Sequence, residues 1–223
     1  MAKDLKIKDA NGDNIEYYGI TNIILNEVSG ETLDIKLPLE DFELPSELTA
    51  PSNIFIFKVN DYKYLLSNDS DNIGVFLLDI TKKTCNKIYN NGTSWSHFFK
   101  TDNNKVLITS KTASNGTQGV LIFDIATNNI KVGIDIGSGW SAFQSTENGV
   151  IIGNGYYSNS KGVLFYDYNT DEITQPITSG YQFYGFNLLK NGNWLIGCSN
   201  SASGLIYYKT STNAFDRIYP NGS

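Results

Sequence analysis

The sequence predicts an all-β protein, and two observations support this fold class. Asn, Gly, Ser and Thr make up 83 of the 223 residues, and these residue types favour turns and strands over helices. A turn dipeptide also recurs at steps of 43, 45 and 43 residues, as Asn60-Asp61, Asn103-Asn104, Asn148-Gly149 and Asn191-Gly192. We therefore expect four successive units of about 43 residues each.

The residues around each dipeptide recur in register. Each pair is preceded by a Phe five residues earlier and, in three units, by a large aromatic residue eight residues earlier (Trp95, Trp140, Phe183). Each pair is followed by an apolar segment, a polar loop, and then Gly with a second apolar run, over residues 74–79, 119–124, 162–167 and 204–209. Each unit is thus expected to hold four short antiparallel strands joined by Asn, Gly and Asp turns.

This repeat resembles the β-propeller superfamily, in which a blade of four strands has a similar period. The resemblance covers residues 52–219, although the repeat lacks the Gly-His and Trp-Asp dipeptides of WD40 units and the double glycine of kelch units. We predict a four-bladed β-propeller over residues 51–223. The ring would be closed by packing of the first blade on the fourth or by a strand from residues 1–50. Cys85 and Cys198 fall in these two blades, which leaves a disulfide or two buried thiols as alternatives.

Residues 1–50 differ in composition from the repeats. They carry a net charge of −7, whereas residues 51–223 carry +1. Pro45 and Pro51 bracket a short polar stretch that we expect to be a linker. Before it, residues 5–8 and 14–18 suggest a first hairpin, and residues 20–28 and 31–39 a second. We therefore predict a small, acidic β-strand module over residues 1–50.

Residues 6–12 (Lys-Ile-Lys-Asp-Ala-Asn-Gly), together with residues 17–23 and Gly30, resemble the opening segment of virion structural proteins from phages of Gram-positive hosts. The resemblance implies that residues 1–50 attach the protein to a viral capsid or tail protein. The propeller would then be displayed on the virion as a head or tail fibre-like decoration.

Charge and hydropathy set limits on location and partners. The sequence has no signal-peptide pattern and no apolar stretch of membrane-spanning length, so we expect synthesis in the host cytoplasm and no membrane insertion. A net charge of −6 argues against a nucleic-acid partner. We expect a homo-oligomer.

The polar loops predict a binding site. In an antiparallel blade, the connection leading into strand one and the loop between strands two and three lie at the same end. Aromatic rings beside amides and hydroxyls are suited to sugars, which stack on aromatic faces and hydrogen-bond to polar groups. The candidate ligand-binding residues are Tyr156, Tyr157, Trp95, Trp140, Tyr181, Asn91 and Asn115. Trp95 and Trp140 are in register with Phe183, so packing between blades is the alternative interpretation for them.

Catalytic residue types are scarce, and we expect neither a cofactor nor a metal site. His97 is the only histidine and is interpreted as structural. Asp79, Asp124 and Asp167 recur at one repeat position, which favours turn capping over catalysis. The hypothesis is a non-enzymatic protein that binds a host-surface carbohydrate. The alternatives are a scaffold that binds a neighbouring virion or bacterial protein and, as a third class, a polysaccharide hydrolase or lyase.

Overall fold

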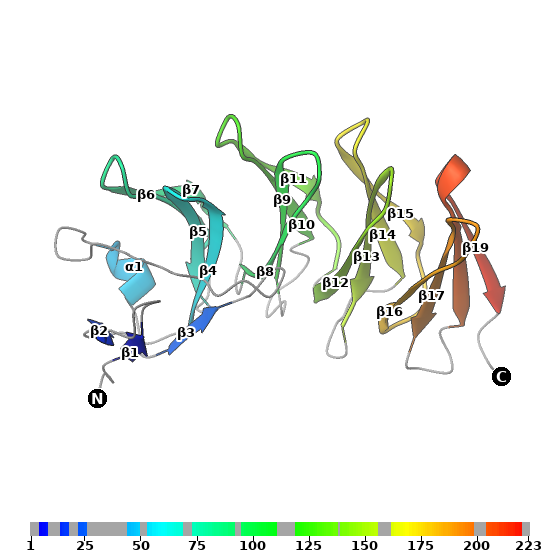
Figure 1. The fold of residues 1–223 in the computed structure, drawn as a ribbon, viewed down its shortest axis with the longest axis horizontal. Helices are drawn as coiled ribbons and strands as arrows, with labels where there is room; N and C mark the ends of the chain where they lie inside the picture. The colour runs from blue at the N-terminus through cyan, green and yellow to red at the C-terminus, as the bar shows by residue number, and fades with distance from the viewer. Residues whose placement is uncertain are drawn as a thin grey trace. The chain divides into compact units, whose positions relative to one another are not determined.

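The computed structural model describes residues 5–8, 14–17, 22–25, 44–49, 53–68, 73–91, 95–110, 119–137, 139–155, 162–198 and 204–219. Nearly all elements in these ranges are β-strands, apart from helix α1 (Ser46–Thr49) and a 3-10 turn (Thr210–Thr212) (Figure 1). The chain forms two compact units, Met1–Phe98 and Phe99–Ser223, and the boundary falls inside strand β8. The boundary that we predicted at residue 50 stays a prediction.

The repeats form four antiparallel sheets, each made of four consecutive strands. Blade 1 contains β4 (Asn53–Asn60), β5 (Lys63–Asn68), β6 (Val75–Asp79) and β7 (Thr84–Tyr89). Blade 2 contains β8 (Trp95–Lys100), β9 (Lys105–Ser110), β10 (Val120–Asp124) and β11 (Ile130–Ile134). Blade 3 contains β12 (Trp140–Ser145), β13 (Gly149–Asn154), β14 (Val163–Asp167) and β15 (Glu172–Ile177). Blade 4 contains β16 (Phe183–Leu188), β17 (Trp194–Cys198), β18 (Leu205–Lys209) and β19 (Ala214–Tyr219). This is the blade architecture of a four-bladed β-propeller, so the predicted fold class is confirmed.

The repeated glycine before the third strand is required by its backbone. Gly74, Gly119, Gly162 and Gly204 all have positive φ, between 58° and 85°. A β-carbon on Gly119 would lie 1.7 Å from the carbonyl oxygen of Ile134, and one on Gly162 would lie 1.7 Å from that of Ile177. Only glycine combines this conformation with so close an approach of the neighbouring strand.

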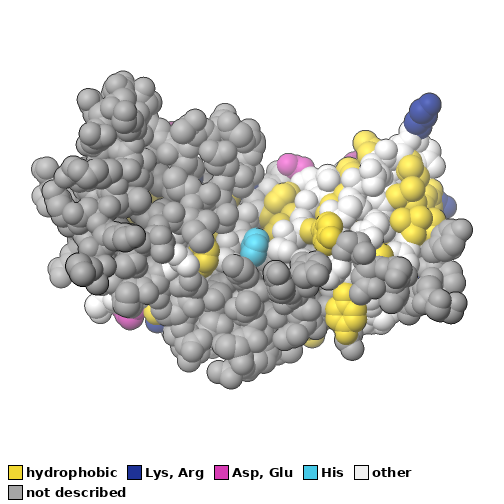
Figure 2. Space-filling model, turned by 90° about the horizontal axis from the view of Figure 1, so that it is seen from below, with side chains coloured by type: hydrophobic (Ala, Val, Ile, Leu, Met, Phe, Trp, Pro, Cys, Tyr) yellow, Lys and Arg dark blue, Asp and Glu magenta, His cyan; other side chains and the backbone are white. Residues whose placement is uncertain are grey.

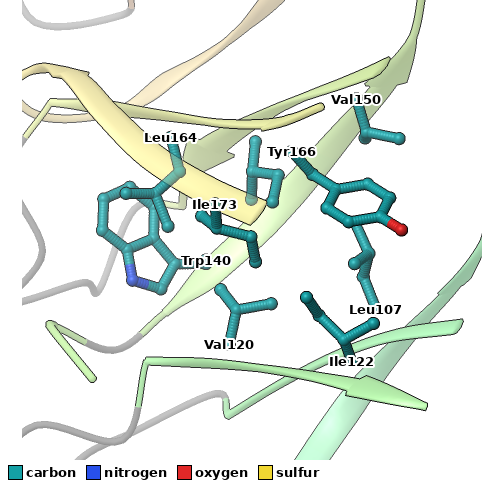
Figure 3. Packing of buried hydrophobic residues seen from close by; sticks show 9 residues of the cluster. Leu107, Val120, Ile122, Trp140, Val150, Leu164, Tyr166 and Ile173 are labelled. Carbon is teal, nitrogen blue, oxygen red and sulfur yellow. The ribbon is translucent and has the colours of Figure 1, made fainter. Parts of the chain in front are cut away.

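The sheets in the second unit pack face to face. We call the face of a blade that packs against the following blade its C-side face. The opposite face, which in blades 3 and 4 packs against the preceding blade, is the N-side face. The C-side face of blade 2 (Leu107, Val120, Ile122) packs against the N-side face of blade 3, as Figure 3 shows for Trp140, Tyr166 and Ile173. The C-side face of blade 3 packs in the same way against the N-side face of blade 4. Here Ile151, Val163 and Phe165 contact Ile196, Ile206 and Tyr208, among others.

The N-terminal segment contributes to blade 1 in two ways. Strand β3 (Asn22–Leu25) pairs in parallel with β4, with Asn22 opposite Asn53, and adds a fifth strand to the sheet. Helix α1 lies beside the same sheet (Figure 1), where Leu48 is fully buried and Leu44 is partly buried against its N-side face. The described part of the expected linker, residues 44–49, is therefore packed on blade 1.

The other expectations for residues 1–50 are met only in part. Strands β1 (Leu5–Lys8) and β2 (Asn14–Tyr17) form the predicted first hairpin, with Leu5 opposite Tyr17. Strand β3 lies within the first strand of the predicted second hairpin and pairs in parallel with β4, while the hairpin itself stays a prediction. Residues 31–39 lie outside the described ranges. Neither Cys85 nor Cys198 forms a disulfide, and burial raises the pKa of the Cys85 thiol to about 12. The disulfide alternative is thus not present in the structure.

Candidate ligand-binding end of the blades

Backbone hydrogen bonds join neighbouring connections at one end of the blades in the second unit. The amide of Gly139 donates to Ser110 O (2.8 Å), and the amide of Gly155 donates to Gly139 O (2.9 Å). The amide of Gly162 donates to Gly180 O (2.7 Å). Each bond connects a segment leading into strand one with an edge of the loop between strands two and three. We call this region the loop end of the blades; in the second unit the two kinds of connection lie at the same end, as expected for antiparallel blades.

The two tryptophans proposed as ligand platforms are buried in the blades. Trp95 is 1% exposed and Trp140 is fully buried. Each indole N–H donates to a carbonyl four residues earlier, Trp95 to Asn91 O (3.0 Å) and Trp140 to Ile136 O (2.9 Å). Since the polar edge is satisfied within the chain and the ring faces are covered, neither side chain is open to a ligand in this structure. Their burial agrees with the alternative interpretation, in which both are core residues.

Exposed aromatic side chains occur at the loop end of blade 4. Tyr181 is 38% exposed and lies between Gly180 and Gln182, both of which have positive φ. Tyr184 is 45% exposed and lies in a bulge of β16, between the residues that pair with Cys198 and Gly197. Bulges commonly redirect a side chain, and this one holds a residue that the sequence analysis did not propose. The sequence carries one signal for Tyr184. At the same repeat position, blades 2 and 3 have the small polar residues Ser96 and Ser141, so a large aromatic residue departs from the pattern.

The remaining candidates are placed only in part. Asn91 is exposed, and its carbonyl oxygen accepts the hydrogen bond from Trp95. Tyr156, Tyr157 and Asn115 lie outside the described residues. For Tyr181, Asn91 and these three residues, ligand binding stays a prediction.

The recurrent aspartates cap turns, as predicted. One carboxylate oxygen of Asp124 accepts hydrogen bonds from the amides of Ala126 (2.8 Å) and Thr127 (2.9 Å). Asp79 binds the amides of Thr81 and Lys82 in the same way, and Asp167 binds those of Asn169 and Thr170. Asp124 also accepts a hydrogen bond from Lys105, which together with the turn amides lowers its pKa from 3.8 to about 2.

A polar network links blades 2 and 3 at the end of the strands opposite the loop end. The Tyr166 hydroxyl donates to Asp171 (2.5 Å) and accepts from the Asn103 amide (3.0 Å). Lys131 donates to the Asp171 carboxylate at 2.9 Å. Burial alone would raise the pKa of Asp171, but hydrogen bonds from Tyr166 and Lys131 outweigh it and lower the pKa. These titratable groups are therefore engaged in holding two blades together.

Blades 3 and 4 have an equivalent network without lysine. The Tyr208 hydroxyl donates to the Asn213 side chain (2.8 Å), which also accepts from the Asn148 amide (3.1 Å). Tyr208 and Asn213 occupy the repeat positions of Tyr166 and Asp171. The same geometry at two blade contacts indicates a structural role for both networks.

His97 is half-buried on β8, and its Nδ1 lies 3.0 Å from Ser96 Oγ. It is the cyan side chain in Figure 2, which also shows hydrophobic side chains in several patches toward the C-terminal blades.

Within the described ranges, no group of three His, Cys, Asp or Glu side chains is arranged to hold a metal ion. No helix among the described residues is long and apolar enough to cross a membrane.

No protein-family model matches the chain, and no curated protein matches it in sequence. Solved structures resemble it at low identity. The extracellular domain of a putative hybrid two-component system from Bacteroides thetaiotaomicron is 12% identical with a TM-score of 0.46, and the match covers 97% of this chain and 30% of that one. An auxiliary nutrient binding protein from Bacteroides ovatus is 11% identical with a TM-score of 0.42, covering 73% and 40%. TolB from Acinetobacter baumannii is 16% identical with a TM-score of 0.34, covering 77% and 45%.

The chain thus spans less than half the length of each of these proteins. The resemblance of residues 6–30 to virion proteins stays a prediction.

Proposed function

We propose that the protein is a non-enzymatic binding protein that recognises carbohydrate at the loop end of its blades. The observation that carries the proposal is the exposure of Tyr181 and Tyr184, three residues apart, at the loop end of blade 4. A tyrosine ring presents an apolar face to a sugar ring, and its hydroxyl can hydrogen-bond to sugar hydroxyls. The backbone bonds among the connections hold this surface in place, which lowers the entropy lost on binding.

The biological setting that we propose is display on a virion. Residues 1–50, with a net charge of −7, would dock on a capsid or tail protein. The near-neutral repeats would then meet an uncharged glycan on the host surface. Mass spectrometry of purified phage particles tests this setting independently of sugar binding, since absence of the protein from the particles would contradict virion display.

Glycan-array binding tests the carbohydrate proposal. We expect the wild-type chain to bind a subset of glycans and Tyr181→Ala or Tyr184→Ala to weaken that binding at least about tenfold, because each removes a stacking surface. The matched control is Tyr62→Ala, which removes a ring that is 58% exposed in the turn between β4 and β5.

Equal binding by all of these variants would contradict the assignment of the site to blade 4. Tyr156→Ala and Tyr157→Ala then test the neighbouring loop of blade 3. If the wild-type chain binds no glycan, the carbohydrate proposal is wrong.

A further inference from the structure

The connection from β15 to β16, which carries Tyr181, is tied to blade 3 by two hydrogen bonds. The carbonyl oxygen of Gly180 accepts from the Gly162 amide (2.7 Å). On the other side of Tyr181, the Phe183 amide donates to Asn154 Oδ1 (3.0 Å), and this bond is buried. The backbone is therefore fixed both before and after Tyr181.

A third bond to the connection comes from Arg217 in β19. Arg217 pairs with Ile206, whose side chain is buried between blades 3 and 4, so Arg217 lies on the N-side face of blade 4. Its Nη2 donates to the carbonyl oxygen of Ser179 at 2.5 Å, two residues before Tyr181. Arg217 is the only arginine among the 17 Lys and Arg residues of the chain. The last strand of blade 4 is thus linked to the connection that leads into its first strand.

An indole N–H has the corresponding place in blades 2 and 3. Trp140 Nε1 donates to Ile136 O (2.9 Å), and the tryptophan of blade 2 bonds to the carbonyl four residues earlier in the same way. Phe183 and Ser179 occupy the repeat positions of Trp140 and Ile136. Because phenylalanine has no side-chain N–H, the guanidinium of Arg217 supplies in blade 4 the donor that tryptophan supplies in the other two blades.

The connection depends on such support, since its backbone is not in a relaxed conformation. Gly180 and Gln182, on either side of Tyr181, have φ values of 95° and 61°. At the repeat position of Gln182, blade 3 has Gly139, with a φ of 74°. A left-handed conformation is unfavourable for glutamine and persists where the surrounding contacts hold it. The orientation of the Tyr181 ring therefore depends on the bonds that fix the connection.

We propose that Arg217 is a positioning residue of the carbohydrate site. Its bond to Ser179 O holds the connection so that the Tyr181 ring is presented to the ligand. This assignment rests on the proposed function. Arg217 acts through the connection and not by contact with the sugar, so an indole N–H at residue 183 should be able to take its place.

The surroundings of residue 183 suit such a replacement. Trp140 packs in one cluster with Leu107 of blade 2. Phe183 packs in another cluster with Ile151 of blade 3, which occupies the repeat position of Leu107. Removal of the Arg217 side chain also leaves room beside the carbonyl oxygen that it contacts. The double variant Arg217→Ala/Phe183→Trp thus restores the arrangement of blade 3.

Amide hydrogen exchange by NMR and glycan binding, both measured on the full chain, test the proposal. In Arg217→Ala, the amides of Gly162 and Phe183 should exchange at least about tenfold faster, because both bonds depend on the position of the connection. Glycan binding should weaken by about tenfold. In Arg217→Ala/Phe183→Trp, both quantities should return toward their wild-type values. The control is Lys209→Ala, which removes the same charge from an exposed side chain of blade 4 and should change neither quantity.

The outcomes separate two roles for Arg217. Unchanged amide exchange in Arg217→Ala would overturn the proposal, and so would a double variant that does not regain slow exchange. If the double variant regains slow exchange but not glycan binding, Arg217 contacts the ligand directly and is not a positioning residue. If the wild-type chain binds no glycan, the proposed function is wrong, while the exchange rates still decide whether Arg217 holds the connection.

Discussion

Gly153 shows how a single hydrogen atom in place of a side chain permits two blades to pack. Its position is occupied by Thr109 in blade 2, where the hydroxyl donates to the carbonyl oxygen of Trp140. The contact between blades 2 and 3 therefore accommodates a β-carbon at this position. The contact between blades 3 and 4 does not, because the carbonyl oxygen of Phe183 occupies the space.

We predict that Gly153→Ala is destabilising by about 3 kcal/mol, since backbone must move to admit the methyl group. The Tm should fall by roughly 5–10 °C in differential scanning calorimetry. Gly197→Ala is the matched control at the same repeat position, and its Tm should change by no more than about 2 °C because the space above it is open. Equal effects of the two variants would contradict the difference in packing.

Asp124 connects local hydrogen bonding to acid stability. Its pKa is about 2 in the folded protein, against an ordinary value of 3.8. As the pH falls through this window the unfolded chain takes up the proton first, so stability present above about pH 4 is lost on acidification.

We predict that Asp124→Asn lowers stability at pH 7 by about 1 kcal/mol, a modest value because the carboxylate is partly exposed. The difference from wild type should shrink as the pH approaches 2, as measured by urea unfolding at several pH values. Asp61→Asn is the control: Asp61 pairs with Lys58 at 3.0 Å but is 79% exposed, so little change is expected. A pH-independent loss in Asp124→Asn would show that turn capping, not charge, is responsible.

At the scale of elements, helix α1 acts as the cover of blade 1. The helix is held by the Asn68 side chain, which donates to Glu47 O at 2.9 Å, and by Lys87 at 4.0 Å from the Glu47 carboxylate. Leu48 reaches the core between β4, β5 and β6, where Ile54, Leu66 and Phe76 are buried.

Leu48→Ala should therefore lower the free energy of unfolding by about 3 kcal/mol, through lost burial and an unfilled cavity. Leu44→Ala should cost less, because Leu44 is only partly buried. Urea unfolding followed by circular dichroism measures both. An unchanged midpoint in Leu48→Ala would mean that α1 is not needed to cover blade 1.

Elements that recur in the repeats could be predicted from the sequence, whereas elements that occur once could not. The four blades and the Asp turn caps were predictable because each recurs at the same position in several repeats. The parallel pairing of β3 was not predictable, since it depends on a contact between strands about 30 residues apart that no local pattern encodes. The packing of α1 was missed because the prolines around it indicated a linker.

At the candidate site, the location of the connections could be predicted from the sequence, but the exposure of their aromatic residues could not. Trp140 and Tyr181 are both large aromatic residues near a first strand, yet one is fully buried and the other is 38% exposed. Trp140 begins β12 and packs against blade 2, whereas Tyr181 lies in the connection before β16, and residue type alone does not distinguish the two. Tyr184 was missed because its exposure arises from a bulge, whose position is not marked by the composition of β16.

At the scale of the whole molecule, the proposed carbohydrate site and the contacts between blades use different parts of a sheet. The proposed site uses the ends of the strands, where connections from neighbouring blades of the second unit are joined by backbone bonds. The contacts between blades use the faces of the sheets, which are filled by buried apolar side chains.

The repeated contact between blades also bears on how such a chain changes length during evolution. The C-side face of blade 2 meets blade 3 much as the C-side face of blade 3 meets blade 4, with equivalent apolar positions and equivalent tyrosine networks. A duplicated segment of one repeat, inserted between existing blades, would meet familiar surfaces on both sides. Gain or loss of whole blades is then an accessible genetic event, while a shift by part of a repeat is not.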